Sequence, residues 1–117
     1  MAKQLQPHGA KAIVHIKYQG DLKKLAVEIE GSLNIPAFWY KTDMDYPHQE
    51  TAMSECMGFE LWLNESKVIK GYPFVIELES TAINGNLEFH STKHDISKWF
   101  SNYLSFSCDF ETCIAVA

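Results

Sequence analysis

The chain has 117 residues, 46% of them hydrophobic and 21% charged, which is enough to form one hydrophobic core without a metal or a disulfide framework. Ten Lys and Arg residues against fifteen Asp and Glu residues give a net charge of −5. This charge argues against direct binding of nucleic acid or of an anionic membrane, and it favours a cationic partner. The sequence contains no apolar run long enough to cross a membrane.

The three cysteines are Cys56, Cys108 and Cys113, and this odd number argues against a secreted disulfide framework. The N-terminal residues lack the apolar core of a signal peptide. We therefore expect a cytoplasmic protein, and no motif in it requires a cofactor. The polar residues 1–10 are interpreted as a flexible leader, and residues 11–117 as a single α+β domain.

The first half of the domain is predicted to hold two strands, one helix and a long loop. Residues 12–18 are rich in β-branched side chains, as is typical of a strand. Asp21 can cap a helix over 22–33, because apolar residues recur there at helical spacing. The aromatic residues 38–40 favour a short strand, and the polar segment from Asp43 to Glu55 predicts a loop.

The second half is predicted to contain consecutive antiparallel strands. Apolar and polar residues alternate over 57–63 and again over 74–80, which is the pattern of half-buried strands. Asn84 and Gly85 form a hairpin signal because both can adopt positive φ, and they lead into a third alternating segment over 87–90.

A second helix is predicted after these strands. Thr92 and Asp95 resemble a capping box, and a regular apolar stripe follows. The stripe consists of Ile96, Trp99, Phe100, Tyr103 and Leu104. The short apolar segment 112–116 predicts a last strand. This order indicates an α+β fold, with a mainly antiparallel sheet of five or six strands and both helices packed on one face.

If the helices cover one face of the sheet, the alternation leaves an acidic and aromatic face on the other side. The predicted members of this face are Glu60, Trp62, Glu77, Glu79, Glu88 and His90. Such a face can bind a basic protein, because complementary charge speeds encounter and tryptophan is enriched at binding hot spots. The alternative is a solvated strand face that only keeps the domain soluble.

A second candidate surface lies in and around the predicted loop. Its residues are Trp39, Asp43, Asp45, Tyr46, Glu50 and Glu55. Loops on rigid scaffolds often carry binding residues, and Asp, Tyr and Trp together suit recognition of Lys or Arg. The alternative is a loop that covers the core with its aromatic side chains.

A zinc site is the first of two alternatives that the residue types leave open. His90 and His94 with Cys108 and Cys113 have spacings that zinc ligands can adopt in reverse order. Because the two cysteines have no Gly or Pro turn between them and the core needs no metal, we expect no metal site.

A small hydrolase or nuclease is the second alternative. His90 can act as a general base together with Glu60 or Glu88, and His15 and His48 are further candidate bases. No nucleophile elbow, phosphate loop or metalloprotease motif occurs in the chain. We therefore expect no catalytic residues.

Three segments carry a resemblance to a known family, namely 55–63 (ECMGFELWL), 71–79 (GYPFVIELE) and 94–100 (HDISKWF). They resemble the small immunity proteins of bacterial polymorphic toxin systems, in particular those of contact-dependent growth inhibition. The resemblance implies a cytoplasmic protein that binds a cognate toxin domain, often a basic nuclease, and blocks its active site or substrate groove. That family shares no catalytic motif, so no functional residue carries over by position.

The sequence therefore predicts a monomeric, non-enzymatic inhibitor that neutralises a basic toxin through an acidic, aromatic surface. The small hydrolase or nuclease is one alternative. The other is an oligomeric regulatory module that dimerises through an edge or a face of its sheet.

Overall fold

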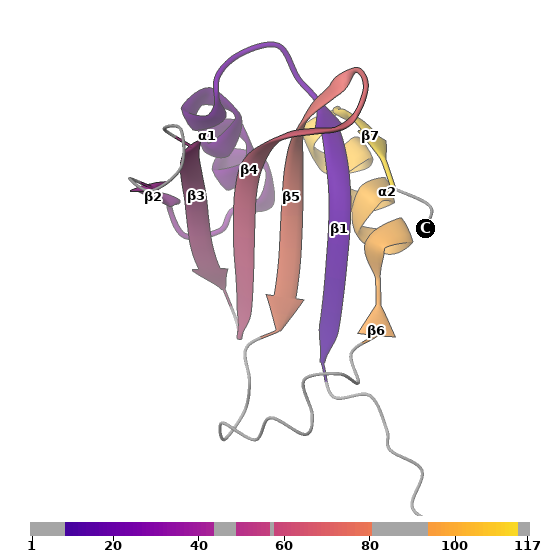
Figure 1. Ribbon diagram of the computed structural model, residues 1–117. Helices are drawn as coiled ribbons and strands as arrows, with labels where there is room; N and C mark the ends of the chain where they lie inside the picture. The colour runs from indigo at the N-terminus through magenta and orange to yellow at the C-terminus, as the bar shows by residue number, and fades with distance from the viewer. Residues whose placement is uncertain (1–8, 44–48, 57, 81–93, 115–117) are drawn as a thin grey trace, which may run out of the picture.

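The computed structural model describes residues 9–43, 49–56, 58–80 and 94–114, without the side chains of Thr42, Asp43 and Gln49. Two helices lie on one side of a twisted sheet (Figure 1). The elements in chain order are β1 (Ala10–Lys17), α1 (Leu22–Leu33), β2 (Trp39–Asp43), β3 (Gln49–Cys56), β4 (Phe59–Ile69), β5 (Tyr72–Ser80), β6 (His94–Asp95), α2 (Ser97–Cys108) and β7 (Glu111–Cys113).

Strand β1 lies inside the sheet and is paired along both of its edges. The sheet order is β2-β3-β4-β5-β1-β6, and β7 also pairs with β1. Strand β5 runs antiparallel to one edge over residues 11–16 of β1. On the other edge, β6 pairs in parallel with residues 10 and 11, and β7 pairs antiparallel with residues 15–17. Since α2 connects β6 to β7, both ends of this helix are joined to one edge of one strand.

The hydrophobic core lies between the helices and the inner face of the sheet. Alternate residues of the strands point to this face, as the two-residue period of a strand requires. Those that are buried and apolar are Ala12, Val14, Ile16, Ala52, Leu61, Leu63, Phe74 and Ile76. Their partners on the helices are Leu22, Leu25, Ala26 and Ile29 of α1 and Phe100 and Leu104 of α2.

Helix α1 begins and ends where local groups satisfy its free backbone atoms. The Asp21 carboxylate accepts a hydrogen bond from the Lys24 N–H at 2.8 Å, as the sequence predicted. At the other end Asn34 adopts the left-handed conformation, with φ of 54°, and its N–H donates to the Glu30 carbonyl. The Glu30 carboxylate then accepts the N–H of Phe38 at 2.6 Å, which directs the chain into β2.

Helix α2 begins at Ser97, where a hydrogen-bond network connects its first turn to β1. The Asp95 carboxylate accepts the Ser97 N–H at 2.9 Å and the Ser97 hydroxyl at 2.6 Å. These bonds from Ser97 hold the pKa of Asp95 below its ordinary value. The Ser97 hydroxyl oxygen also accepts the N–H of Ile13 at 3.0 Å. Ile13 lies between the parts of β1 that pair with β6 and β7, so Ser97 satisfies a backbone donor that neither strand reaches.

The predicted fold class is confirmed, because the sheet is mainly antiparallel and both helices lie on one face. The described residues form seven strands rather than five or six, since β3 forms within the segment predicted to be a loop and β6 includes Asp95, which was predicted to belong to the cap of the second helix. The loop prediction for Asp43 to Glu55 is therefore wrong over residues 49–55. Pairing of β3 with β2 on one side and β4 on the other overrides the weak strand propensity of this segment.

Other predicted elements are shifted or lie outside the described residues. The apolar stripe predicted for the second helix is divided, because Phe100 and Leu104 are buried whereas Trp99 and Tyr103 are exposed. The predicted last strand is found as β7. The leader was predicted to span residues 1–10, but Ala10 begins β1 and the Gly9 carbonyl accepts the N–H of His94, so the prediction is wrong at these two residues. The rest of the leader, the hairpin signal at 84–85, the strand over 87–90 and the capping residue at 92 fall among residues 1–8 and 81–93, which are not described.

We expect Ser97→Ala to lower the free energy of unfolding by about 1–3 kcal/mol, because it leaves the Ile13 N–H without an acceptor and removes a donor to Asp95. Urea denaturation followed by circular dichroism measures this change. Asn102→Ala, an exposed substitution on the same helix, is the control and should change the value by less than about 0.5 kcal/mol. A Ser97→Ala protein as stable as this control would contradict the role assigned to the network.

Candidate partner-binding surface

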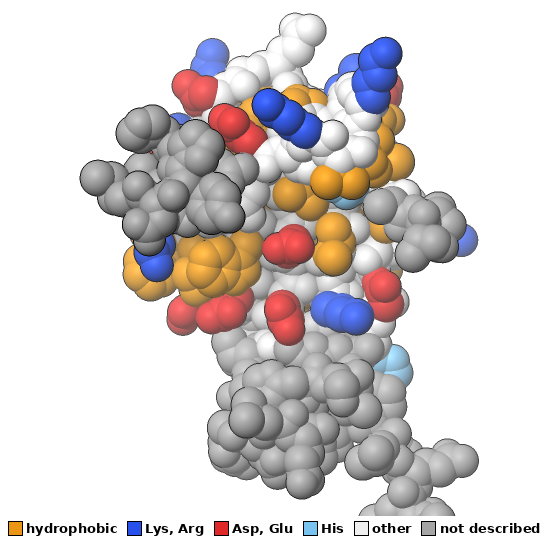
Figure 2. Space-filling view, in the orientation of Figure 1, with side chains coloured by type: hydrophobic (Ala, Val, Ile, Leu, Met, Phe, Trp, Pro, Cys, Tyr) orange, Lys and Arg blue, Asp and Glu red, His pale blue; other side chains and the backbone are white. Residues whose placement is uncertain are grey.

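The sheet face that points away from the helices is the candidate binding surface, and we refer to it as the open face (Figure 2). Directly paired residues on neighbouring antiparallel strands point to the same face with their Cβ atoms about 5 Å apart. The strand register therefore arranges the side chains of the open face in rows that cross the sheet.

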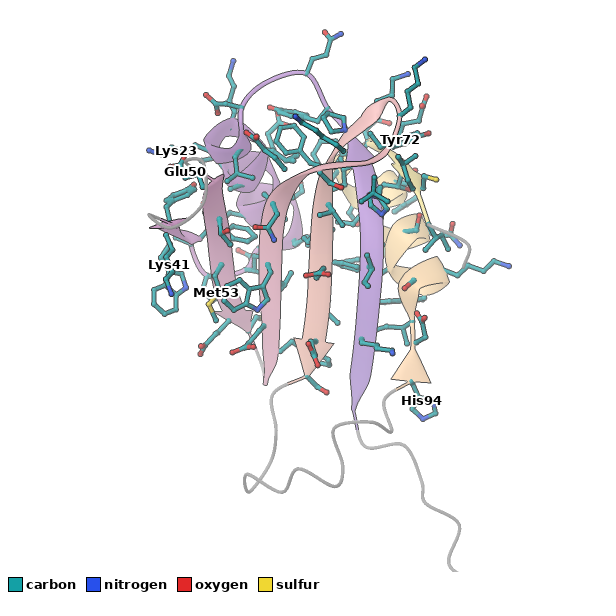
Figure 3. All side chains as sticks on the ribbon, in the orientation of Figure 1. Lys23, Lys41, Glu50, Met53, Tyr72 and His94 are labelled. Carbon is teal, nitrogen blue, oxygen red and sulfur yellow. The ribbon has the colours of Figure 1, made fainter. Side chains whose placement is uncertain are left out.

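The first row is aromatic and apolar. Trp39 pairs with Met53, and Met53 pairs with Trp62, so three large side chains from β2, β3 and β4 stand side by side. The side chain of Trp39 is 60% exposed, whereas Met53 and Trp62 are half-buried. Figure 2 shows hydrophobic side chains gathered at this side of the sheet, and Figure 3 labels Met53. We refer to Trp39, Met53 and Trp62 as the aromatic row.

The second row is acidic. Glu55 pairs with Glu60, and Glu60 pairs with Glu79, which we refer to as the carboxylate row. Lys11 of β1 pairs with Glu79 at the end of this row. Neither Glu55 nor Glu60 forms an ion pair with any residue in the described part of the chain. Because like charges directly opposite each other destabilise a sheet, this row opposes folding and favours the approach of a cation.

The two rows are close enough to act on one ligand. Glu60 and Trp62 are two residues apart on β4, a separation of about 7 Å along a strand. The same spacing separates Glu55 from Met53 on β3 and Glu79 from Glu77 on β5. A single lysine or arginine side chain can therefore contact an indole ring and a carboxylate together.

The structure joins residues that the sequence assigned to two separate surfaces. Trp39 and Glu55 were predicted to belong to the loop surface, and Glu60, Trp62, Glu77 and Glu79 to the sheet face, yet all six lie on the open face. Strand β3 connects them. Sequence reasoning missed Met53, although the alternation of Thr51, Met53 and Glu55 with Ala52 and Ser54 indicates this strand and this face.

Glu50 does not belong to this surface. It lies on the helix side of β3, where its carboxylate is 3.4 Å from the Lys23 ammonium of α1. That ammonium is also 5.4 Å from the centre of the Tyr40 ring (Figure 3 labels Lys23 and Glu50). Glu50 therefore helps to join α1 to the sheet and is separated from the carboxylate row.

The remaining predicted site residues cannot be placed on either face. Asp45, Tyr46, Glu88 and His90 lie outside the described residues. Asp43 ends β2, but its side chain is not described. Their part in binding stays a prediction.

We expect Glu60→Gln to raise the free energy of unfolding by about 0.2–1 kcal/mol, because it removes the central charge of the carboxylate row. Urea denaturation at low and at high salt measures the effect, which should shrink as salt screens the charges. Glu65→Gln on the same strand is the matched control, since Glu65 pairs with Phe74 rather than with a carboxylate. If Glu60→Gln destabilises the fold relative to this control, the carboxylates do not repel one another as argued.

His15 lies on the open-face side of β1 but is only 4% exposed. Its register neighbours are Val75 on one side and Cys113 on the other. The Nδ1 atom is buried and has no hydrogen-bond partner among the described residues. Burial lowers the pKa of His15, and the charge on Glu77 acts in the opposite direction. His15 is therefore shielded from any ligand on the open face, which weakens its candidacy as a general base.

The lowered pKa of His15 predicts a loss of stability in mild acid. Below the ordinary histidine pKa of about 6.5 the unfolded chain binds a proton more readily than the folded one, so the free energy of unfolding falls as the pH decreases. We expect His15→Leu to reduce this pH dependence, because it removes the buried imidazole. Urea denaturation between about pH 7.5 and 5 provides the test. Equal slopes in the wild type and in His15→Leu would refute the prediction.

The described residues do not bring metal ligands together. No group of three or more His, Cys, Asp or Glu side chains in the described ranges has the geometry to hold a metal ion. His94 pairs with Ala10 and Cys113 with His15, which places the two about 17 Å apart along β1. Burial also raises the pKa of the Cys108 thiol, which disfavours the thiolate that zinc requires.

Comparisons with known proteins do not identify a family for this chain. The chain matches no protein-family model, no curated protein and no solved structure. Among the described residues, no helix is long and apolar enough to span a membrane. The case for a function therefore depends on the residues of the open face.

Proposed function

We propose that this chain is an immunity-type inhibitor that binds a basic protein toxin through its open face and neutralises it in the cytoplasm. The observation that supports the proposal is the side-by-side arrangement of the aromatic row and the carboxylate row. The resemblance of segments in this sheet to immunity proteins and the net charge of −5 agree with such a role.

The two rows suit arginine and lysine for separate physical reasons. An exposed indole such as that of Trp39 attracts a cation through the negative face of its ring, and a planar guanidinium can stack on it. The carboxylates two residues away can accept hydrogen bonds from the same cation. A nuclease binds phosphates with just such cationic side chains, so an acidic face can occupy that site without being a substrate.

Charge repulsion within the carboxylate row gives a further reason for the proposal. Glu55 and Glu60 face each other directly, and a bound cationic partner would relieve their repulsion. Relief of this repulsion then adds to the favourable free energy of binding. The attraction between the carboxylates and a cationic partner also makes the association fast and dependent on ionic strength.

The two alternatives have less support. A hydrolase or nuclease using His90 with Glu60 or Glu88 depends on two residues outside the described ranges, and the buried His15 offers no accessible base. For a regulatory module that dimerises through a face of its sheet, the open face would bring two carboxylate rows together, which like-charge repulsion opposes. Dimerisation through an edge of the sheet stays a prediction that no observation favours.

We expect the tagged chain to form a stoichiometric complex with the product of the gene immediately upstream, since immunity proteins are encoded beside their toxins. Pull-down and mass spectrometry identify the complex, and titration calorimetry at two salt concentrations measures its Kd. Glu60→Gln should weaken binding on the order of tenfold at low salt, and Trp62→Ala by at least as much. The Glu60→Gln effect should diminish at high salt, and the Trp62→Ala effect should persist.

Glu65→Gln is the control, because it removes an equal charge from the same strand but on the opposite side of the sheet. Circular dichroism verifies that each variant is folded. If Glu65→Gln weakens binding as much as Glu60→Gln does, the loss of affinity comes only from the change in net charge. This result would refute the open face as the binding site. Recovery of the chain alone would overturn the inhibitor proposal and turn attention to substrate screening around His90.

A further inference from the structure

The outer face of α2 carries three exposed aromatic side chains that the open face does not use. Trp99, Tyr103 and Phe106 are spaced by four and three residues and so lie along one side of the helix. Their exposed fractions are 58%, 40% and 90%. The Trp99 and Tyr103 rings stack with centroids 5.3 Å apart and an angle of 7° between their planes. We refer to these three residues as the aromatic stripe.

The aromatic stripe is separate from the core contacts of α2. Phe100 and Leu104 are buried against the sheet and α1, and they hold the helix in place without help from the stripe. Exposed apolar side chains are common singly, but a contiguous group on one helix marks an interaction surface. The aromatic stripe is therefore the part of α2 that is available to a partner.

From the charge around the stripe, we infer that a second copy of this chain binds there. Within Ser97–Cys108 the only charged residue is Lys98, and the helix contains no carboxylate, although the whole chain carries a net charge of −5. Two acidic molecules repel each other on average, so they can approach most closely where both lack negative charge. The nearest carboxylates along the chain, Asp95 and Asp109, lie beyond the two ends of the helix, so the middle of the stripe offers no carboxylate of α2 to a basic partner.

In a two-fold dimer, α2 of one molecule packs against α2 of the other, so each aromatic stripe is buried against its own copy. In an isologous interface each patch meets its own copy, so the stacked rings of Trp99 and Tyr103 in one molecule can pack against the same two rings of the other. The helix has 12 residues and is about 18 Å long, which makes the shared area small. We therefore expect a weak, reversible dimer with a Kd of micromolar or above.

Such a dimer leaves both open faces available. The helices lie on the opposite side of the sheet from the open face (Figure 1), so pairing through α2 turns the two open faces outward. This arrangement differs from the monomer expected from the sequence and from a dimer formed through the sheet. It does not require the proposed toxin partner, and its test is independent of that proposal.

Sedimentation equilibrium of the full chain from micromolar to millimolar concentration tests the inference. The wild type should show a reversible monomer–dimer equilibrium, and Phe106→Lys should weaken it on the order of tenfold or more. Because Phe106 is almost fully exposed, this substitution should leave the circular dichroism spectrum unchanged. Val68→Lys on the β4–β5 hairpin is the control, since it adds the same charge in place of another exposed apolar residue.

Salt provides a second readout. Dimerisation through an aromatic, carboxylate-free helix should persist or strengthen at high salt, because salt screens the repulsion between two acidic molecules. A monomer at every concentration overturns the inference. A dimer that Phe106→Lys does not weaken, or that Val68→Lys weakens equally, also overturns it, because another surface would then be responsible.

Discussion

Strand β1 is paired on both edges, and this pairing positions most of the other elements. Strand β5 occupies one edge, while β6, the Ser97 hydroxyl and β7 together satisfy the other. Because β6 and β7 flank α2, the helix is fixed across the inner face of β1, where Phe100 and Leu104 reach the core. Helix α1 lies beside it and covers the inner face of β3 and β4. With both helices on one side, no helix of the described ranges covers the other face of the sheet.

The open face combines features that oppose stability with features that favour recognition. A row of like charges and an exposed tryptophan add nothing to the core, and solubility alone would be served by alternating charges. On the inner face, by contrast, even polar groups are paired, as the buried Ser54 hydroxyl donates to the Pro36 carbonyl at 2.8 Å. This contrast between a paired polar group on the inner face and the facing carboxylates of Glu55 and Glu60 on the open face is the reason that we propose the open face for binding.

The parts of the fold with strong local signals could be predicted from the sequence. The Asp21 cap, the alternation in β4 and β5 and the apolar period of α1 all depend on neighbouring residues. Strand β3 could not be recognised with equal ease, because its inward residues are the small Ala52 and Ser54 and its pairing partners provide the stability. For α2, spacing alone did not decide which aromatic residues are buried. Trp99 and Phe100 are adjacent on the helix, and only the position of the sheet assigns Phe100 to the core.

The position of β1 also determines when the domain can fold during synthesis. Its residues leave the ribosome before those of every other described strand, yet its neighbours β5, β6 and β7 follow more than fifty residues later. The β2–β3–β4–β5 meander has short connections and can form before β6 and β7 are synthesised. Until β5 emerges, the β-branched run of Ile13, Val14 and Ile16 has two unpaired edges, and until β6 and β7 emerge it keeps one, so it is open to aggregation. Completion of the fold is therefore a late, non-local step with a high contact order, and a chaperone would act most usefully on this first strand.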